Sequence, residues 1–290
     1  MRTIRLKAYA KVNLGLDVLR KREDGYHEVR MIMQSVDIYD RIEMKKINDA
    51  KIIVETNLKF LPTNQDNLVY KAAKLLFDTY NLPGGLEINL RKYIPVAAGM
   101  AGGSTDAAAV LYGINRMYEL NLSLEELMEH GVKIGADVPF CLMRGTVLAE
   151  GIGEKLTKLK AAPDCHVVIA KPPYGVSTKW VYTTLKADEI EEHPDIDALL
   201  RAIEEGDLHK LAASMGNVLE PVTKTEHRSI GEIEDIMKEE GALNALMSGS
   251  GPTVFGLFED KEDAMRALDR IQQAQLAKQV YLTRLRGDLA

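Results

Sequence analysis

The 290-residue sequence is poor in cysteine and contains no long apolar run. Its two cysteines, Cys141 and Cys165, lie far apart and belong to no C-x-x-C pair or histidine cluster, so neither a disulfide framework nor a zinc site is indicated. No window approaches the roughly 18 apolar residues of a membrane span, and no apolar segment of signal-peptide length follows the basic N-terminus. We therefore expect a cytoplasmic protein whose thiols are buried and reduced.

The sequence also lacks an excess of positive charge, with 37 Lys and Arg residues against 43 Asp and Glu residues and a formal net charge of −6 at pH 7. A general nucleic-acid or membrane-surface binder needs an exposed basic field, so we expect neither partner. Binding of a small anionic ligand requires only a local group of positive charges. Repeats are absent too, and 46% hydrophobic residues are ordinary for a globular chain long enough for two domains. The oligomeric state stays open.

What the sequence does contain is a glycine-rich turn between a strand and a helix. Residues 86–90 alternate as in a strand, and residues 105–118 carry apolar side chains at helical spacing. The loop between them, residues 95–105, has three glycines within five positions, which lets the backbone approach a ligand closely. The unpaired N–H groups and the positive dipole end at the helix start suit a phosphate. A tight structural turn is the alternative interpretation.

Two common phosphate motifs do not match this loop. A Walker A loop has Lys after its last glycine, whereas Ser104 follows Gly103 here. The dinucleotide fingerprint G-x-G-x-x-G does not match the spacing of Gly99, Gly102 and Gly103 either. If the loop binds phosphate, it does so as another kind of motif.

The remaining pattern predicts an α+β chain in two halves. The first half shows strand patterns at 3–19, 31–44 and 52–55, a last strand and turn at 145–153, a helix capped by Asp66-Asn67, and a capping box at residues 123–126 that opens another helix. The second half begins near residue 161. Its strand patterns at 165–170, 243–247, 253–258 and 279–285, with helices between them, indicate a ferredoxin-like sandwich.

Some polar residues are candidates for chemistry, although each also has a structural interpretation. Lys11 and Asn13 lie on the face of the first strand opposite its apolar residues, where a lone lysine usually faces water. Tyr26 and His27 follow a turn and could bind a flat ligand, or could be a packed ring beside a solvent histidine. Asp137 could bond to its own turn, or be a carboxylate held at a helix exit and aimed at a ligand.

Three separated stretches together carry a resemblance. Lys11-Val-Asn13, the loop 95–105 and the segment 248–256 resemble, in order and spacing, the three motifs of the galactokinase, homoserine kinase, mevalonate kinase and phosphomevalonate kinase (GHMP) superfamily. The match spans nearly the whole chain. Asp24-Gly-Tyr-His27 and Gly135-Ala-Asp-Val-Pro139 are most similar to the motifs of its 4-diphosphocytidyl-2-C-methyl-D-erythritol kinase family.

The resemblance implies a fold and a reaction. The fold is α+β, with a nucleotide-binding N-terminal domain like one domain of a small-subunit ribosomal protein (residues 1–160), a ferredoxin-like C-terminal domain (residues 161–290) and the active site between them. The reaction is the ATP- and Mg²⁺-dependent phosphorylation of the 2-hydroxyl of 4-diphosphocytidyl-2-C-methyl-D-erythritol, a step of the non-mevalonate isoprenoid pathway. A kinase of the superfamily for homoserine, mevalonate or a sugar is the nearest alternative. A nucleotide-binding regulator without turnover is another, as is a scaffold role.

The resemblance also implies residue roles. Asp137 would take the proton of the acceptor hydroxyl, and Lys11 would lower the pKa of that hydroxyl and steady the phosphoryl group. Tyr26 would stack on the cytosine, His27 would bind its edge, and Tyr182 would lie on its other side. The implied ATP set is Asn67, Leu68, Lys92, Pro95, Gly99, Met100, Ala101, Gly102, Gly103, Ser104 and Thr105, and the rest of the implied substrate set is Asn13, Ile152, Thr178, Gly249 and Ser250. Ser104 or Thr105 offers Mg²⁺ a hydroxyl, but the metal ligands stay unassigned.

Overall fold

The computed structural model describes residues 2–287, which form two compact units, each built from several chain segments. Unit 1 contains residues 2–10, 38–94 and 101–143, and unit 2 contains residues 11–37, 95–100 and 144–287. The two long strands β1 (Thr3–Lys21) and β2 (His27–Ile47) each run through both units. The division into domains at residue 160 stays a prediction.

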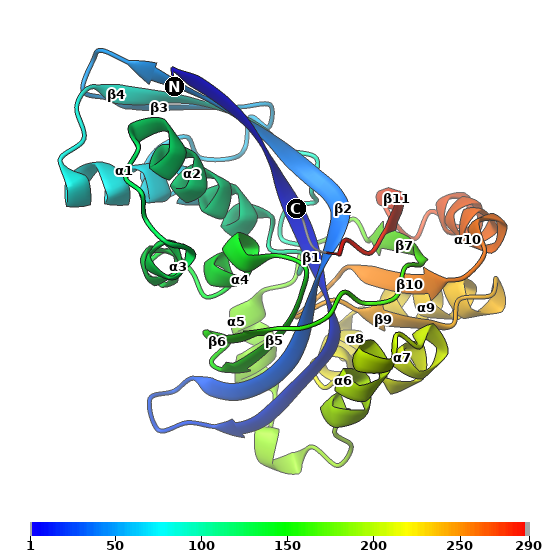
Figure 1. Cartoon of the computed structure of the whole chain (residues 1–290). Helices are drawn as coiled ribbons and strands as arrows, with labels where there is room; N and C mark the ends of the chain where they lie inside the picture. The colour runs from blue at the N-terminus through cyan, green and yellow to red at the C-terminus, as the bar shows by residue number, and fades with distance from the viewer. Residues whose placement is uncertain (1, 288–290) are drawn as a thin grey trace. The chain divides into compact units, whose positions relative to one another are not determined.

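In unit 1 a sheet with the order β3-β4-β2-β1 has helices on one side (Figure 1). Strands β3 (Ile52–Thr56) and β4 (Gly85–Arg91) pair in parallel, and β4 pairs antiparallel with β2. The helices of this unit are α1 (Leu68–Tyr80), α2 (Gly102–Tyr118), α3 (Leu124–Val132) and α4 (Val138–Met143). The alternate residues Ile42, Met44, Ile88 and Leu90 are buried, while their neighbours on the opposite face of the sheet are wholly or partly exposed.

The helix starts of unit 1 follow local chemistry. Asn67 caps α1 and Ser123 opens α3 with a complete capping box, and both features confirm the sequence prediction. Helix α2 begins at Gly102, three residues before the expected start, directly after Ala101 adopts a left-handed backbone conformation (φ 55°). The short helix α4 was not predicted.

Unit 2 contains the ferredoxin-like part that the sequence predicted. Its antiparallel sheet has the order β11-β7-β10-β9, and its main elements follow one another as strand, helices, two strands, helix and strand. These elements are β7 (His166–Lys171), β9 (Asn244–Met247), β10 (Val254–Phe258) and β11 (Gln279–Arg284), with α9 (Ser229–Glu239) and α10 (Lys261–Gln273) packed beside them. All five residues of the central strand β10 are buried.

Further elements of unit 2 lie along β1 and β2. Strand β5 (Thr146–Gly151) pairs with β2 and with β6 (Lys155–Lys158), and β8 (Gly216–Asn217) pairs in parallel with β1. The helices are α5 (Thr178–Thr184), the 3₁₀ turn η1 (Ala187–Glu189), α6 (Ile196–Glu205), α7 (Leu208–Ser214) and α8 (Glu220–Glu226). Strands β6 and β8 and helix α8 were not predicted, because they are too short to show a period.

The state of the two cysteines and the character of the helices were both expectations from the sequence. Cys141 and Cys165 are both buried and free of any disulfide, as predicted. Among the helices of residues 2–287, none combines the length and the apolar character that crossing a membrane requires.

Candidate active site

The predicted site residues divide into two sets by unit, here called the unit 1 cluster and the unit 2 cluster. Asn67, Leu68, Lys92, Ala101, Gly102, Gly103, Ser104, Thr105 and Asp137 belong to unit 1. Lys11, Asn13, Tyr26, His27, Pro95, Gly99, Met100, Ile152, Thr178, Tyr182, Gly249 and Ser250 belong to unit 2. The glycine-rich loop contributes to both clusters, because the chain passes from unit 2 to unit 1 between Met100 and Ala101.

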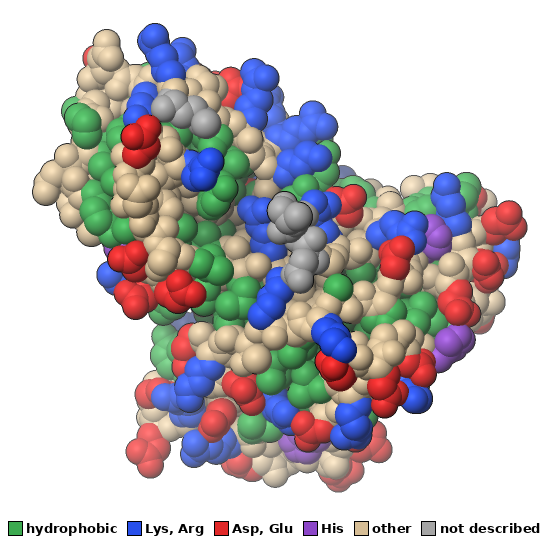
Figure 2. Space-filling view, viewed as in Figure 1, with side chains coloured by type: hydrophobic (Ala, Val, Ile, Leu, Met, Phe, Trp, Pro, Cys, Tyr) green, Lys and Arg blue, Asp and Glu red, His purple; other side chains and the backbone are tan. Residues whose placement is uncertain are grey.

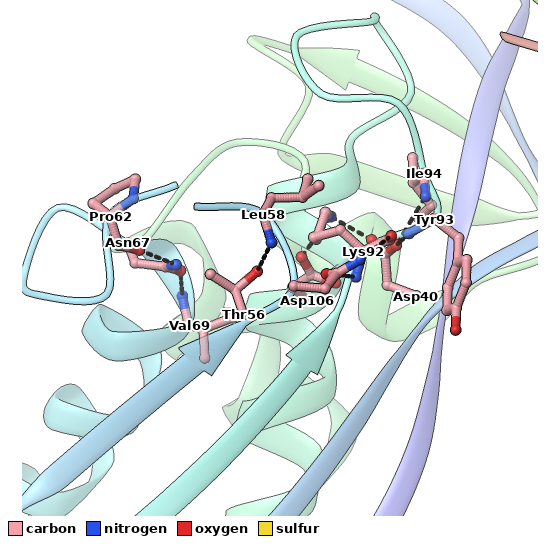
Figure 3. A network of polar contacts seen from close by, with 11 residues as sticks. Asp40, Thr56, Leu58, Pro62, Asn67, Val69, Lys92, Tyr93, Ile94 and Asp106 are labelled. Atoms are coloured by element: carbon pink, nitrogen blue, oxygen red, sulfur yellow. Dashed lines mark hydrogen bonds and ion pairs between the residues drawn. The ribbon is translucent and has the colours of Figure 1, made fainter. Parts of the chain in front are cut away.

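The unit 1 cluster is built on a buried group of charges (Figure 3). The Lys92 ammonium group contacts the carboxylates of Asp40 and Asp106, and the Nζ to Asp106 Oδ2 distance is 2.7 Å. The other oxygen of Asp40 accepts the backbone N–H groups of Tyr93 and Ile94 at 2.5 and 2.8 Å. Asp40 therefore fixes the segment of residues 92–94, which leads into the glycine-rich loop.

Burial acts on the pKa values of both Asp106 and Lys92. The largest effect on Asp106 is its removal from water, which raises the pKa of its carboxyl well above the ordinary value. Burial also lowers the pKa of Lys92, but the carboxylates of Asp106 and Asp40 outweigh that effect and raise it. The side chain assigned to ATP by resemblance is thus held by two acidic residues.

The starts of α1 and α2 lie close to this group. Asn67 Oδ1 accepts the N–H of Val69 at 2.9 Å, and Asn67 Nδ2 donates to the carbonyl of Pro62 at 2.7 Å (Figure 3). A Cβ atom on Gly103 would lie 3.3 Å from Leu68 Cδ1, and one on Gly102 would lie 3.2 Å from Lys92 Nζ. The first N–H groups of both helices lack partners within their helix, so this part of unit 1 offers donors for an anion.

Ser104 and Asp137 belong to the same unit. A Cβ atom on Gly135 would lie 4.0 Å from Ser104 Oγ and 3.7 Å from Val138 Cγ2. The half-buried Asp137 precedes α4, and its carbonyl accepts the N–H of Cys141 at 3.1 Å. Asp137 therefore lies in the connection between the end of α3 and the start of α4, and its catalytic role stays a prediction.

The described residues provide little of a dedicated metal site. Within residues 2–287 no group of three or more His, Cys, Asp or Glu side chains could hold a metal ion. Mg²⁺ commonly keeps several waters and binds through substrate phosphates and one or two protein oxygens. In the glycine-rich loop and the first turn of α2, Ser104 supplies a hydroxyl, while the nearby Asp106 is already paired with Lys92.

In unit 2 the predicted catalytic lysine is buried. Lys11 is 5% exposed, and its ammonium group donates to Asn13 Oδ1 at 2.6 Å. Asn13 is 1% exposed and its amide contacts the sulfur of Met31 at 3.4 Å. The expectation of a solvated lysine is therefore wrong, because β1 is covered on the face that carries Lys11 and Asn13.

Two glycines bring the three sequence motifs together in this unit. A Cβ atom on Gly249 would lie 3.4 Å from Asn13 Oδ1 and 3.5 Å from Lys11 Nζ. A Cβ atom on Gly99 would lie only 2.2 Å from the carbonyl oxygen of Ser248, and the Ser248 hydroxyl donates to the Gly99 carbonyl at 3.0 Å. Positive φ values of 71° at Gly99 and 58° at Gly249 disfavour a side chain at both positions, and at Gly99 the lack of space excludes one as well.

Three polar residues that sequence reasoning missed support the loop 248–251. The Asn217 amide donates to the carbonyls of Met247 and Gly249, each at 2.8 Å. The Thr223 hydroxyl donates to the carbonyl of Ser250 at 3.3 Å, and Glu220 accepts the N–H of Met247 at 2.7 Å. These residues belong to β8 and α8, elements too short to carry a recognisable motif.

Glu220 belongs to a second charged group. Lys224 Nζ lies 2.6 Å from Glu220 and 2.5 Å from Glu234 of α9. Burial, and next to it the Glu220 carboxylate, raise the pKa of Glu234 to about 7. Through Lys224 and Glu220, the contacts that support the loop therefore extend to Glu234, whose pKa is raised to about 7.

The residues assigned to the cytosine do not all meet. The His27 and Tyr182 rings have centroids 5.3 Å apart, tilted by 43°. Tyr26 is 61% exposed, and its N–H donates to Asp24 at 3.1 Å. Burial, followed by the charge of Lys21, lowers the pKa of His27. Elsewhere in the substrate set, the Thr178 and Ser250 hydroxyls are bonded at 2.8 Å, and the Ile152 N–H donates to Glu154 at 2.6 Å.

Comparisons with known proteins identify relatives of the whole chain. Residues 67–145 match the GHMP kinases N terminal domain, and residues 199–278 match the GHMP kinases C terminal domain. The chain is 56% identical to the 4-diphosphocytidyl-2-C-methyl-D-erythritol kinase of Lachnospira eligens, and the match covers 98% of each chain.

Solved structures agree with this result. A crystal structure of a 4-(cytidine 5'-diphospho)-2C-methyl-D-erythritol kinase superposes with a TM-score of 0.84 at 32% identity, covering 98% of this chain and 100% of that one. The homoserine kinase of Cytophaga hutchinsonii superposes with a TM-score of 0.80 at 20% identity, covering 98% and 95%. The second likeness shows the shared fold alone.

The charge cluster of unit 1 predicts unequal roles for its two carboxyl groups. Asp40→Ala removes the partner of Lys92 and of two backbone N–H groups, and we expect it to lower the free energy of unfolding by about 3–5 kcal/mol, as for other broken buried pairs. Asp106→Asn keeps the shape of the side chain and an oxygen that can accept from Lys92, and we expect a smaller loss of about 1–3 kcal/mol. Urea denaturation of both variants measures the difference, and equal losses would contradict the assignment.

Glu234 predicts a pH dependence of stability. Its folded pKa of about 7 lies above the ordinary 4.5, so its contribution is fully present below pH 4.5 and is lost as the pH rises through 7. The difference between the folded and unfolded pKa values corresponds to a decline on the order of 3 kcal/mol in the free energy of unfolding. Glu234→Gln should remove this decline. Urea denaturation from pH 4.5 to 8 measures it, with the exposed Glu232→Gln of the same helix as control. An unchanged pH profile in Glu234→Gln would refute the assignment.

Proposed function

Because the chain belongs to the 4-diphosphocytidyl-2-C-methyl-D-erythritol kinases of the GHMP family, we propose that it transfers a phosphoryl group from ATP to 4-diphosphocytidyl-2-C-methyl-D-erythritol. The chain is a kinase, and the reaction is a step of isoprenoid biosynthesis. We further propose that the 2-hydroxyl of the methylerythritol unit is the acceptor.

The observation that supports this proposal best is the meeting of Lys11 with two glycine-rich loops. Phosphoryl transfer needs little covalent chemistry from the protein, so positioning and charge stabilisation carry the rate. Lys11 supplies a cation beside Gly249, and the missing side chain of Gly99 lets the backbone at Ser248 approach closely. A buried cation acts more strongly than an exposed one, because less water screens it.

The two predicted catalytic residues have separate tasks in the proposal. Asp137 accepts the proton of the acceptor hydroxyl as general base. Lys11 stabilises the alkoxide character of that oxygen and the charge on the transferring phosphoryl group. Asn13 holds the Lys11 ammonium group through its side-chain oxygen and therefore orients it. This contact supports a positioning role for Asn13 beside the substrate contact that the resemblance implies.

ATP binding is proposed for the donor-rich starts of α1 and α2. The loop 95–105 and the first turn of α2 would take the phosphates, and Asn67 and Leu68 would lie near the adenosine. Mg²⁺ would neutralise charge on the phosphates, and Ser104 is the residue that we propose to hold it. Cys141 and Cys165 are buried and form no disulfide, which suits a reducing compartment, and on that basis we propose the cytoplasm.

The cytidine end of the acceptor is proposed to bind at the aromatic residues of unit 2. The exposed face of Tyr26 would stack on the base, with His27 at its edge and Tyr182 on its other side. A kinase acting on homoserine or mevalonate has no base to bind, so the Asp24 to His27 motif favours the cytidine conjugate over the rival acceptors.

Replacing the catalytic residues should abolish turnover without unfolding the protein. We expect Lys11→Ala and Asp137→Asn each to lower kcat by about 100-fold or more, the usual contribution of a charge-stabilising group or a general base. Coupled-enzyme measurement of ADP formation gives kcat, and circular dichroism verifies folding. Lys45→Ala, an exposed lysine of β2, serves as the control and should keep the wild-type rate. Near-normal turnover in either site variant would overturn the assigned mechanism.

Replacing the aromatic residues should weaken acceptor binding selectively. Loss of base stacking costs about 1–3 kcal/mol, so Tyr26→Ala and Tyr182→Ala should raise the KM for the cytidine conjugate by about 5- to 150-fold. The KM for ATP should stay unchanged, and Tyr26→Phe should behave like the wild type because it keeps the ring. Steady-state kinetics with each substrate varied in turn tests this. Unchanged acceptor KM values would place the cytosine elsewhere.

A further inference from the structure

A pocket lies on the open face of the unit 1 sheet, opposite the helices α1 and α2. Its volume is about 690 Å³, which is within the range of small-molecule sites. The residues that line it come from β1, β2 and β4 and are Arg5, Leu6, Lys7, Tyr39, Arg41, Ile42, Glu43, Asn89 and Arg91. None of them has a role in the proposed phosphoryl transfer.

The pocket is strongly basic in a chain whose net charge is −6. It has four cationic side chains and a single acidic one, Glu43, whose carboxylate is already paired with Arg5 at 2.5 Å. Among the ion pairs of residues 2–287, none includes Lys7, Arg41 or Arg91. Figure 2 shows Lys and Arg side chains gathered on the side of β1 and β2 away from α1 and α2.

The register of the sheet increases this imbalance. Arg41 of β2 and Arg91 of β4 are direct partners in the antiparallel pair, and like charges directly opposite each other destabilise a sheet. Two residues further along each strand, Glu43 pairs with Asn89, so the acidic residue does not oppose either arginine. An arrangement that costs stability in the empty protein is accounted for if an anion neutralises it.

Aromatic rings hold the cations in place. Lys7 Nζ lies 4.3 Å from the centroid of the Tyr39 ring, and Arg41 Cζ lies 5.9 Å from that ring and 5.7 Å from the ring of Tyr93. The nearby cations, Arg41 first and then Lys7, lower the pKa of the Tyr39 hydroxyl. The cations are therefore oriented by their neighbours before any ligand arrives.

We propose that this pocket binds the diphosphate or triphosphate group of a small molecule, at a site separate from the phosphoryl transfer. Guanidinium groups match phosphate oxygens with two parallel hydrogen bonds, and two arginines with a lysine suit a ligand of several negative charges. The volume fits a small molecule rather than a polymer. The proposal does not depend on the proposed function, because its residues lie outside both clusters.

Titration calorimetry with inorganic pyrophosphate at low ionic strength tests the proposal. The full-length wild type is compared with the Arg41→Gln/Arg91→Gln double variant and with Lys45→Gln, which removes a cation from the same face of β2 outside the pocket. Binding of pyrophosphate at the nucleotide site is the same in all three proteins, so a difference between them reports on the basic pocket. We expect the double variant to bind pyrophosphate at least tenfold more weakly than the wild type and Lys45→Gln to bind it equally well.

Thermal unfolding supplies a second readout. Without ligand, the double variant should unfold at a higher temperature than the wild type, because the opposed arginines no longer repel, and its stabilisation by pyrophosphate should be reduced. Its kcat and its KM for ATP should equal those of the wild type. Equal pyrophosphate affinity in all three proteins would overturn the proposal, as would loss of kinase activity in the double variant. Tighter wild-type binding of a single-stranded oligonucleotide than of pyrophosphate would overturn the small-ligand class.

Discussion

The close approach of Gly99 to Ser248 is the constraint on which the unit 2 cluster depends. A side chain on Gly99 would overlap the Ser248 carbonyl, and the same two residues are joined by a hydrogen bond. This contact ties residues 95–100 to the loop 248–251, although about 150 positions separate them in the chain. Lys11 joins them through its backbone bond to Met100 and through the nearness of its ammonium group to Gly249. Three motifs that are remote in sequence therefore act as one structure.

The chain uses buried lysines in two different ways. Lys92 is surrounded by carboxyl groups that stabilise its charge, and it holds a segment of backbone in place. The contacts of Lys11 include an amide oxygen, which orients the ammonium group but brings no negative charge to it. Asn13 thus orients Lys11, whereas the carboxyl groups of Asp40 and Asp106 give Lys92 a structural task. The catalytic role of Lys11 stays a prediction.

The sequence predicted most of the fold because its long elements are strongly periodic. The alternation in residues 3–19, the cap at Asn67 and the capping box at Ser123 each correspond to an observed element. The burial of Lys11 could not be predicted locally, because it depends on contacts made by residues far along the chain. The support from Asn217 and Glu220 was missed for the same reason, since a single polar residue in a short element carries no pattern. The burial of Lys92 between Asp40 and Asp106 could not be predicted from the sequence either.

The most direct test of the account is ADP formation by the purified protein with ATP, magnesium and a panel of acceptors. The panel contains 4-diphosphocytidyl-2-C-methyl-D-erythritol, methylerythritol phosphate, mevalonate and homoserine. The account predicts turnover with the cytidine conjugate alone, because only that acceptor carries a base for the aromatic residues of unit 2. Comparable turnover with mevalonate or homoserine, or none with the cytidine conjugate in a protein that binds ATP, would contradict it.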